Sequence, residues 1–210
     1  MDAIPLLGRA LGVASLAGIN LYLTTLLIGI SIRFNLIHLH ENYQSLEILA
    51  NPWVLGTSAI LGGIEFFADK IPWIDSMWDA IHTVVRPIGG ALLAMKTLGA
   101  ISPEMAVLGA LLGATASITT HTAKAGARVL ANTSPEPLSN LALSVGEDAI
   151  VAFGAALVLK YPIASLFVFI TAIILLWMML IRIFRKIGGV FGLLGSKIPG
   201  RPKNCSPDRI

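Results

Sequence analysis

Long apolar stretches separated by short polar segments make up most of the chain. A helix needs about 20 mostly apolar residues to cross the hydrocarbon core of a bilayer. Stretches near or above that length occupy residues 6–32, 52–68, 74–100, 103–130, 138–159 and 162–181. The last is the clearest, because it contains no charged residue. The pattern predicts an all-α, polytopic membrane protein with about six transmembrane helices.

Two polar residues, Arg9 and Asn20, interrupt the first stretch. Its apolar character nevertheless continues to Ile32, which is too long for the hydrophobic region of a signal peptide. We therefore expect a retained helix over residues 6–32, in which Asn20 forms hydrogen bonds to neighbouring helices.

The second to fifth stretches contain a weak internal repeat. Val54-Leu55-Gly56 opens one predicted hairpin of helices, and Val107-Leu108-Gly109 opens the next. This similarity favours a parallel repeat of two helical hairpins. Chance similarity between segments rich in Gly, Ala and Leu explains it equally well.

The composition narrows the class of protein. Hydrophobic residues make up 55% of the 210 residues and charged residues 13%, about half the charged share of a soluble protein. The mean hydropathy of +0.79 is more than a chain of this length can hide in a single core. These values exclude a disordered chain, a disulfide scaffold and a nucleic-acid-binding domain. Membrane lipids are the expected partners.

The charge is unevenly distributed. From Arg182 onward the chain has seven Lys or Arg and one acid, a net of +6, whereas residues 1–181 have eight bases and eleven acids, a net of −3. The positive-inside rule predicts that the basic end is cytoplasmic and lies against anionic headgroups. With six spans, both termini are cytoplasmic and the loop at 34–50 is outside. We expect one transmembrane domain over 1–186 and a basic cytoplasmic tail over 187–210.

Charged residues also occur inside the predicted spans, where they are costly. Asp75, Asp79, His82 and Arg86 are spaced 4, 3 and 4 residues apart, which places them on one face of a helix. Glu65 and Asp69 form an i, i+4 pair at the end of the preceding span. An interfacial amphipathic helix with a wet charged face is the alternative interpretation of residues 74–86.

The second hairpin has the same feature. His121, Lys124 and Arg128 share a helix face, and Glu147-Asp148 lies in the middle of the fifth span. Two acids there cost about 5–7 kcal/mol, against about 3–6 kcal/mol gained from the span's large apolar residues. This helix therefore needs basic partners, a hydrated cavity or protonation of a carboxyl. Lys124 and Arg128 are the available partners.

These charges form one candidate site for a small ion or small-molecule substrate. Six acids face four bases when Lys70 is counted, which leaves two negative charges that a divalent cation, two monovalent cations or bound protons would balance. Asp75, Asp79 and His82 are the candidate metal ligands. The complete set of candidate binding residues is Glu65, Asp69, Asp75, Asp79, His82, Arg86, His121, Lys124, Arg128, Glu147 and Asp148.

Several of these motifs occur together in a known family. They are Gly18-Ile19-Asn20-Leu21-Tyr22, Glu65-Phe66-Phe67-Ala68-Asp69-Lys70, Asp75-Ser76-Met77-Trp78-Asp79 and Asn132-Thr133-Ser134-Pro135-Glu136-Pro137. Together, these segments resemble a bacterial membrane family catalogued as domain of unknown function 4126. The resemblance covers roughly residues 8–182 and implies a polytopic protein of the bacterial inner membrane, with no assigned activity.

Three functions follow from these residues. The first is a small transporter or permeation protein in which the buried acids bind a cation or relay protons, while His82 and His121 gate by protonation. The second is an intramembrane metal-dependent enzyme acting on a lipid phosphate, with Arg86, Lys124 and Arg128 holding the phosphate. The third is a non-catalytic membrane scaffold in which the charges are internal salt bridges.

Overall fold

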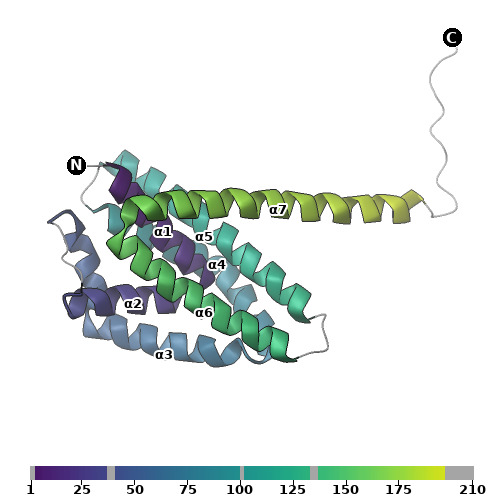
Figure 1. Cartoon of the computed structure of the whole chain (residues 1–210), viewed down its shortest axis with the longest axis horizontal. Coiled ribbons are helices and arrows are strands. Elements are labelled where there is room, and N and C mark those ends of the chain that lie inside the picture. The colour runs from purple at the N-terminus through teal and green to yellow at the C-terminus, as the bar shows by residue number, and fades with distance from the viewer. Residues whose placement is uncertain (1–2, 37–40, 100–101, 133–136, 197–210) are drawn as a thin grey trace, which may run out of the picture. The chain divides into compact units, whose positions relative to one another are not determined.

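The computed structural model describes residues 3–36, 41–99, 102–132 and 137–196, and every regular element in these ranges is helical. The elements are α1 (Ala3–Ile19), α2 (Leu21–Arg33), the 3₁₀ helix η1 (Glu41–Ala50), α3 (Pro52–Ala68), α4 (Pro72–Leu98), α5 (Pro103–Asn132), α6 (Pro137–Lys160) and α7 (Pro162–Ser196) (Figure 1). The all-α prediction is confirmed. The chain divides into two compact units, Met1–Leu176 and Trp177–Ile210, and the features below belong to the first unit.

Proline sets the starts of five helices. The helices α3, α4, α5, α6 and α7 each begin with a Pro, whose fixed φ suits the first helical position and whose missing N–H would be unpaired there. The predicted second to fifth spans agree with α3 to α6 to within two residues at each end. The last helix is longer than predicted and continues to Ser196.

The first predicted helix is two helices, so the prediction of one continuous segment over 6–32 is wrong. Asn20 has extended backbone angles, with φ −148° and ψ 103°, and its side chain accepts a hydrogen bond from the Leu23 amide. The Oδ1 to N distance is 2.9 Å. Asn20 therefore acts as the N-cap of α2, which ends α1 after 17 residues.

Length and apolar character support fewer spans than six. Within the described residues, 103–129, 141–160 and 162–182 are long and apolar enough to cross a membrane. The apolar parts of α1, α2 and α3 are shorter than 18 residues. The helix α4 has 27 residues, but charged side chains occupy its first half. Six is therefore an approximate count.

The segment before α3 is more ordered than the predicted loop at 34–50. Residues Glu41–Ala50 form η1, and Leu46 and Leu49 are buried, with 2% and 6% exposure. In a 3₁₀ helix, residues three apart lie on the same side, so both leucines enter the core together. His38 and His40, which lie in this segment, are outside the described residues, as are residues 133–136 of the motif at 132–137 and the tail from residue 197.

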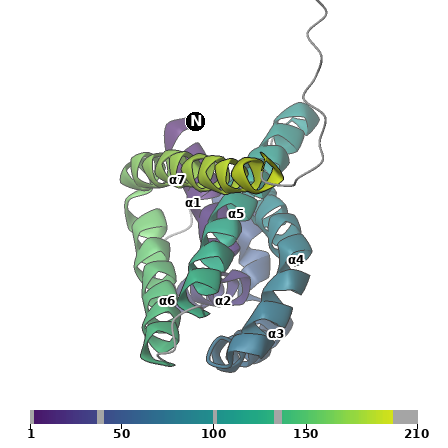
Figure 2. The same cartoon turned by 90° about the vertical axis from the view of Figure 1, so that its right-hand side faces the viewer.

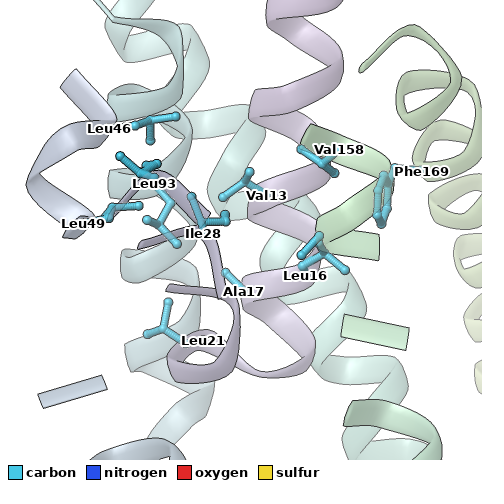
Figure 3. Close-up of a cluster of buried hydrophobic side chains, with 12 residues drawn as sticks. Val13, Leu16, Ala17, Leu21, Ile28, Leu46, Leu49, Leu93, Val158 and Phe169 are labelled. Carbon is cyan, nitrogen blue, oxygen red and sulfur yellow. The ribbon is translucent and has the colours of Figure 1, made fainter. Parts of the chain in front are cut away.

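The core is centred on α1 and α2. The helix α1 contacts α4, α5 and α6, and α2 contacts α3 and η1 (Figures 1 and 2). Figure 3 shows Val13 and Leu16 of α1 facing Val158 and Phe169, while Ile28 of α2 lies near Leu49 and Leu93. This apolar packing fixes the end of α1, and the charged residues gather around that end.

Two glycines bring α4 and α5 close together. A Cβ atom at Gly113 would lie 2.6 Å from the Ala94 Cβ and 2.8 Å from the Gly90 carbonyl oxygen. Small residues allow such approach of helix backbones, which is the usual packing device in membranes. The charged residues of α4 and α5 lie along these two helices, so their close approach brings the two sets together.

Candidate functional site: a buried charge network

The charged residues predicted from sequence converge. Ten of the eleven candidates have exposures of 8% or less, and Asp148 is half-buried. Nine are joined by ion pairs and hydrogen bonds into what we term the charge network. It comprises Glu65, Asp69, Asp75, Asp79, Arg86, His121, Lys124, Arg128 and Glu147.

Arg86 on α4 joins α3 to α5. Its Nη2 donates to Glu65 Oε1 at 2.6 Å, and its Nη1 lies 3.4 Å from Asp79 Oδ1 and 2.6 Å from His121 Nδ1. The Gly18 carbonyl at the end of α1 accepts a further bond at 3.4 Å. The side chains of Arg86 and Glu65 are both fully buried, so this pair is shielded from solvent.

Lys124 on α5 lies among three carboxylates. Its Nζ is 3.4 Å from Glu65 Oε1, 3.4 Å from Asp69 Oδ2 and 3.3 Å from Glu147 Oε2. It also donates to the Ile19 carbonyl at 3.3 Å. The partial negative charge at the C-terminus of α1 thus adds to that of the carboxylates.

Arg128, one turn further along α5, holds Glu147 with two hydrogen bonds. Its Nε and Nη2 donate to the two Glu147 oxygens at 3.1 and 2.6 Å. The same guanidinium contacts Asp69 Oδ2 at 3.1 Å and Asp75 Oδ1 at 3.2 Å, and donates to the Asp69 carbonyl at 2.7 Å. The two adjacent acids that make insertion of α6 into a bilayer costly therefore have different surroundings. Glu147 pairs with bases, whereas Asp148 points away from them.

Asp148 and Lys70 lie outside the network. Asp148 Oδ1 accepts from Asn20 Nδ2 at 3.4 Å. Lys70 Nζ donates to the Phe66 carbonyl at 2.9 Å and lies 3.1 Å from the centre of its ring. The network therefore contains five acids and three bases, with His121 as its ninth member. Its net charge is −2 when every acid is ionised, and the half-buried Asp148 is close by on α6.

All three bases pair with carboxylates, but several carboxylate oxygens have no hydrogen-bond donor. Each of Arg86, Lys124 and Arg128 contacts two or three carboxylates. Five of their oxygens are buried and have no hydrogen-bond partner among the described residues, namely Glu65 Oε2, Asp69 Oδ1, both oxygens of Asp75 and Asp79 Oδ1. Asp75 has an exposure of 1%, and its contact with Arg128 is an ion pair without hydrogen-bond alignment. Buried carboxylate oxygens of this kind accept protons or cations.

The two histidines have different surroundings. His121 Nε2 lies 3.1 Å from Thr83 Oγ1, which in turn donates to the Asp79 carbonyl at 2.9 Å. His82 lies beside the network: its Nδ1 is 2.8 Å from the Trp78 carbonyl, and its Nε2 is 3.0 Å from the Tyr22 hydroxyl. The His82 ring also stacks on Trp78 with 4.7 Å between centroids.

The helix α4 turns its charged face inward. Asp75, Asp79, His82 and Arg86 have exposures of 1%, 6%, 2% and 0%, so the alternative of an interfacial helix with a wet charged face is wrong. The one-face prediction from their spacing is confirmed. Within the described residues, no group of three or more His, Cys, Asp or Glu is arranged to hold a metal ion, so the structure does not gather Asp75, Asp79 and His82 as ligands.

Sequence reasoning missed three contributors. Thr83 lies four residues after Asp79, on the same helix face, and this spacing was a usable signal. The carbonyl groups of Gly18 and Ile19 gave no signal, because they become available only where α1 ends. That end depends on the backbone conformation of Asn20, which the apolar pattern does not reveal.

Comparison with known proteins gives a family but no activity. Residues 7–182 match the family model described as domain of unknown function (DUF4126). No curated protein and no solved structure matches the chain.

Proposed function

Because the chain belongs to the DUF4126 family, whose description assigns no activity, we propose a function from the site itself: a small membrane permeation protein that carries protons or a small cation through the charge network. The inner-membrane location and the cytoplasmic termini are part of this proposal. Among the residues that the structure describes, three apolar helices are long enough to cross a membrane, which supports its membrane setting.

The main support for the proposal is that the bases of the network are paired, whereas several of its carboxylate oxygens are not. Of the side-chain nitrogens of the three bases, only Arg86 Nε is buried without a hydrogen-bond partner among the described residues. Among the described residues, five carboxylate oxygens of the network are buried without a hydrogen bond. A buried excess of negative charge is costly unless protons or cations balance it. The site therefore favours positively charged cargo.

The connectivity of the network supports movement rather than a single fixed binding position. Lys124 is almost equally distant from Glu65, Asp69 and Glu147, and Arg128 shares Asp69 and Glu147 with it. Neighbouring carboxylates can therefore exchange a positive partner in steps across α3, α5 and α6. Asp79 and Asp75 extend the same path along α4.

The same geometry weighs against an enzyme acting on a lipid phosphate. That function requires Arg86, Lys124 and Arg128 to hold a phosphate, yet each already contacts carboxylates of this chain. Phosphate binding would have to displace several ion pairs in a site with an excess of negative charge. A cation meets no such competition.

The test is flux into liposomes that contain the purified full-length chain. We expect a pH-sensitive dye to report proton entry under an imposed potential, and Asp75→Asn and Asp79→Asn to reduce it strongly. Glu104→Gln is the matched control, because this acid is exposed at the start of α5. Sodium and potassium gradients test the small-cation case in the same vesicles.

Two outcomes would overturn the proposal. One is the absence of proton, sodium and potassium flux in vesicles whose protein is helical by circular dichroism. The other is unchanged flux in Asp75→Asn, Asp79→Asn and Glu147→Gln, which would show that the flux does not pass through the charge network and that its charges are internal salt bridges.

A further inference from the structure

A large cavity lies directly beside the charge network. It has a volume of about 890 Å³ and is lined by residues of α1, α5, α6 and the part of α7 before Trp177. This volume is in the range of pockets that hold drug-sized organic molecules. It is much larger than a proton or a small inorganic ion requires.

The cavity wall is apolar except where it meets the network. Lys124 and Glu147 are the two charged residues among those that line it. The remaining wall includes Ile150, Phe153 and Phe169. An occupant therefore needs an apolar body, and a charged group on it would lie beside Lys124 and Glu147.

The contacts that Lys124 and Glu147 make within the charge network determine which sign of charge the cavity favours. The Lys124 ammonium is already surrounded by three carboxylates and the Ile19 carbonyl, so it offers little to an incoming anion. The network as a whole has an excess of acids, and in an apolar setting that excess acts over several ångströms. Two aromatic residues, Phe153 and Phe169, also line the cavity, and aromatic side chains are more compatible with a positive than with a negative charge.

We infer that this cavity binds a hydrophobic organic cation, with its apolar body between α5, α6 and α7 and its positive centre toward Glu147. The inference rests on the proposed function, since it names a cargo class for the same network. Both shape and charge determine which ligand binds. The apolar wall favours a large apolar body, and the acidic network favours a positive charge.

Two ions of matched size and opposite charge test it. Tetraphenylphosphonium and tetraphenylborate have nearly the same apolar surface, so equilibrium dialysis against the full chain in detergent isolates the effect of charge. We expect saturable binding of tetraphenylphosphonium, tighter than that of tetraphenylborate by about tenfold or more. Equal binding of the two ions, or tighter binding of the anion, would overturn the inference. The cavity would then be interpreted as a groove for lipid chains.

Variants locate the binding. Ala172→Phe fills the cavity from α7 and should abolish saturable tetraphenylphosphonium binding. Leu112→Phe, in a separate apolar cavity of about 350 Å³, should leave it unchanged. Glu147→Gln should weaken binding of the cation and reduce its preference over the anion, and circular dichroism of each variant checks its folding. Undiminished binding in Ala172→Phe would overturn the location.

The two proposals fail separately. Proton or small-cation flux without tetraphenylphosphonium binding would remove the organic cation and retain the permeation function. Saturable, charge-selective binding without any flux would retain the ligand class and remove permeation.

Discussion

Arg86 Nη1 lies 2.6 Å from His121 Nδ1. A guanidinium only donates hydrogen bonds, so Nδ1 must accept and cannot carry a proton. The imidazole is therefore neutral, with its proton on Nε2, and that proton points to Thr83 Oγ1 at 3.1 Å. A doubly protonated His121 would lose its bond to Arg86, so protonation of this ring and release of Arg86 are coupled.

This relationship predicts the tautomer of His121. Nitrogen NMR of the chain with isotope-labelled histidine should show that the His121 ring is neutral and protonated at Nε2 near neutral pH. His82 should be the opposite tautomer, because its Nδ1 faces the Trp78 carbonyl, which only accepts. Comparison with His121→Asn assigns the signals. A doubly protonated His121 at neutral pH would contradict the geometry.

The buried pair of Arg86 and Glu65 should show strong coupling in stability. Arg86→Met leaves a fully buried carboxylate without its closest partner, and we expect a loss of about 3–5 kcal/mol in the free energy of unfolding. The double variant Arg86→Met/Glu65→Leu should lose less than Arg86→Met alone, because the uncompensated charge is gone. Unfolding in mixed detergent micelles measures both. Strictly additive losses would show that the two residues act independently.

Two glycines of α5 should respond oppositely to alanine. Gly113→Ala places a methyl group within 2.6 Å of Ala94 and should destabilise the packing of α4 on α5. Gly126→Ala meets no atom within 4 Å and should stabilise the helix by about 0.5–1 kcal/mol, since Gly is a poor helix residue. The unfolding midpoints of the two variants give the comparison. Equal effects of the two substitutions would contradict the close approach of the helices.

Asn20 has two roles that substitution can separate. Asn20→Ala removes the cap of α2, which costs about 1 kcal/mol, and also removes the donor to Asp148. Asn20→Asp keeps the cap acceptor but places two carboxylates together, so it should be less stable than Asn20→Ala at neutral pH. It should recover at acidic pH, where a protonated carboxyl donates to its neighbour. Unfolding midpoints at the two pH values test this. A higher midpoint for Asn20→Asp than for Asn20→Ala at neutral pH would show that Asp148 does not face this side chain.

The charged face of α4 could be predicted from sequence because helical spacing fixes which side chains share a direction. The identity of their partners could not, since it depends on how α3, α5 and α6 pack against that face. Lys70 illustrates the limit. It lies next to Asp69 in sequence, but α3 has already ended there, and its side chain turns back to Phe66.

The helix starts at proline can be predicted from sequence for a similar local reason, whereas the break at Asn20 cannot. An asparagine inside an apolar stretch is compatible with a continuous helix that bonds its neighbours. It becomes a cap only when its backbone is extended, and here Asp148 of α6 holds its side-chain amide. That contact joins residues 128 positions apart, which no local pattern contains.

The break at Asn20 also constrains the order of biogenesis. A helix of 13 residues rises about 20 Å, less than the hydrocarbon thickness of a bilayer, so α2 cannot cross alone. At this break the Gly18 and Ile19 carbonyls and the Asn20 side-chain amide take their polar partners from α4, α5 and α6, and Asp148 leaves the ribosome long after Asn20. We expect α1 and α2 to stay bound to the insertion machinery, or at the membrane surface, until α6 has been synthesised. Helices α1 and α2, although synthesised before α6, would then reach their final positions only after it.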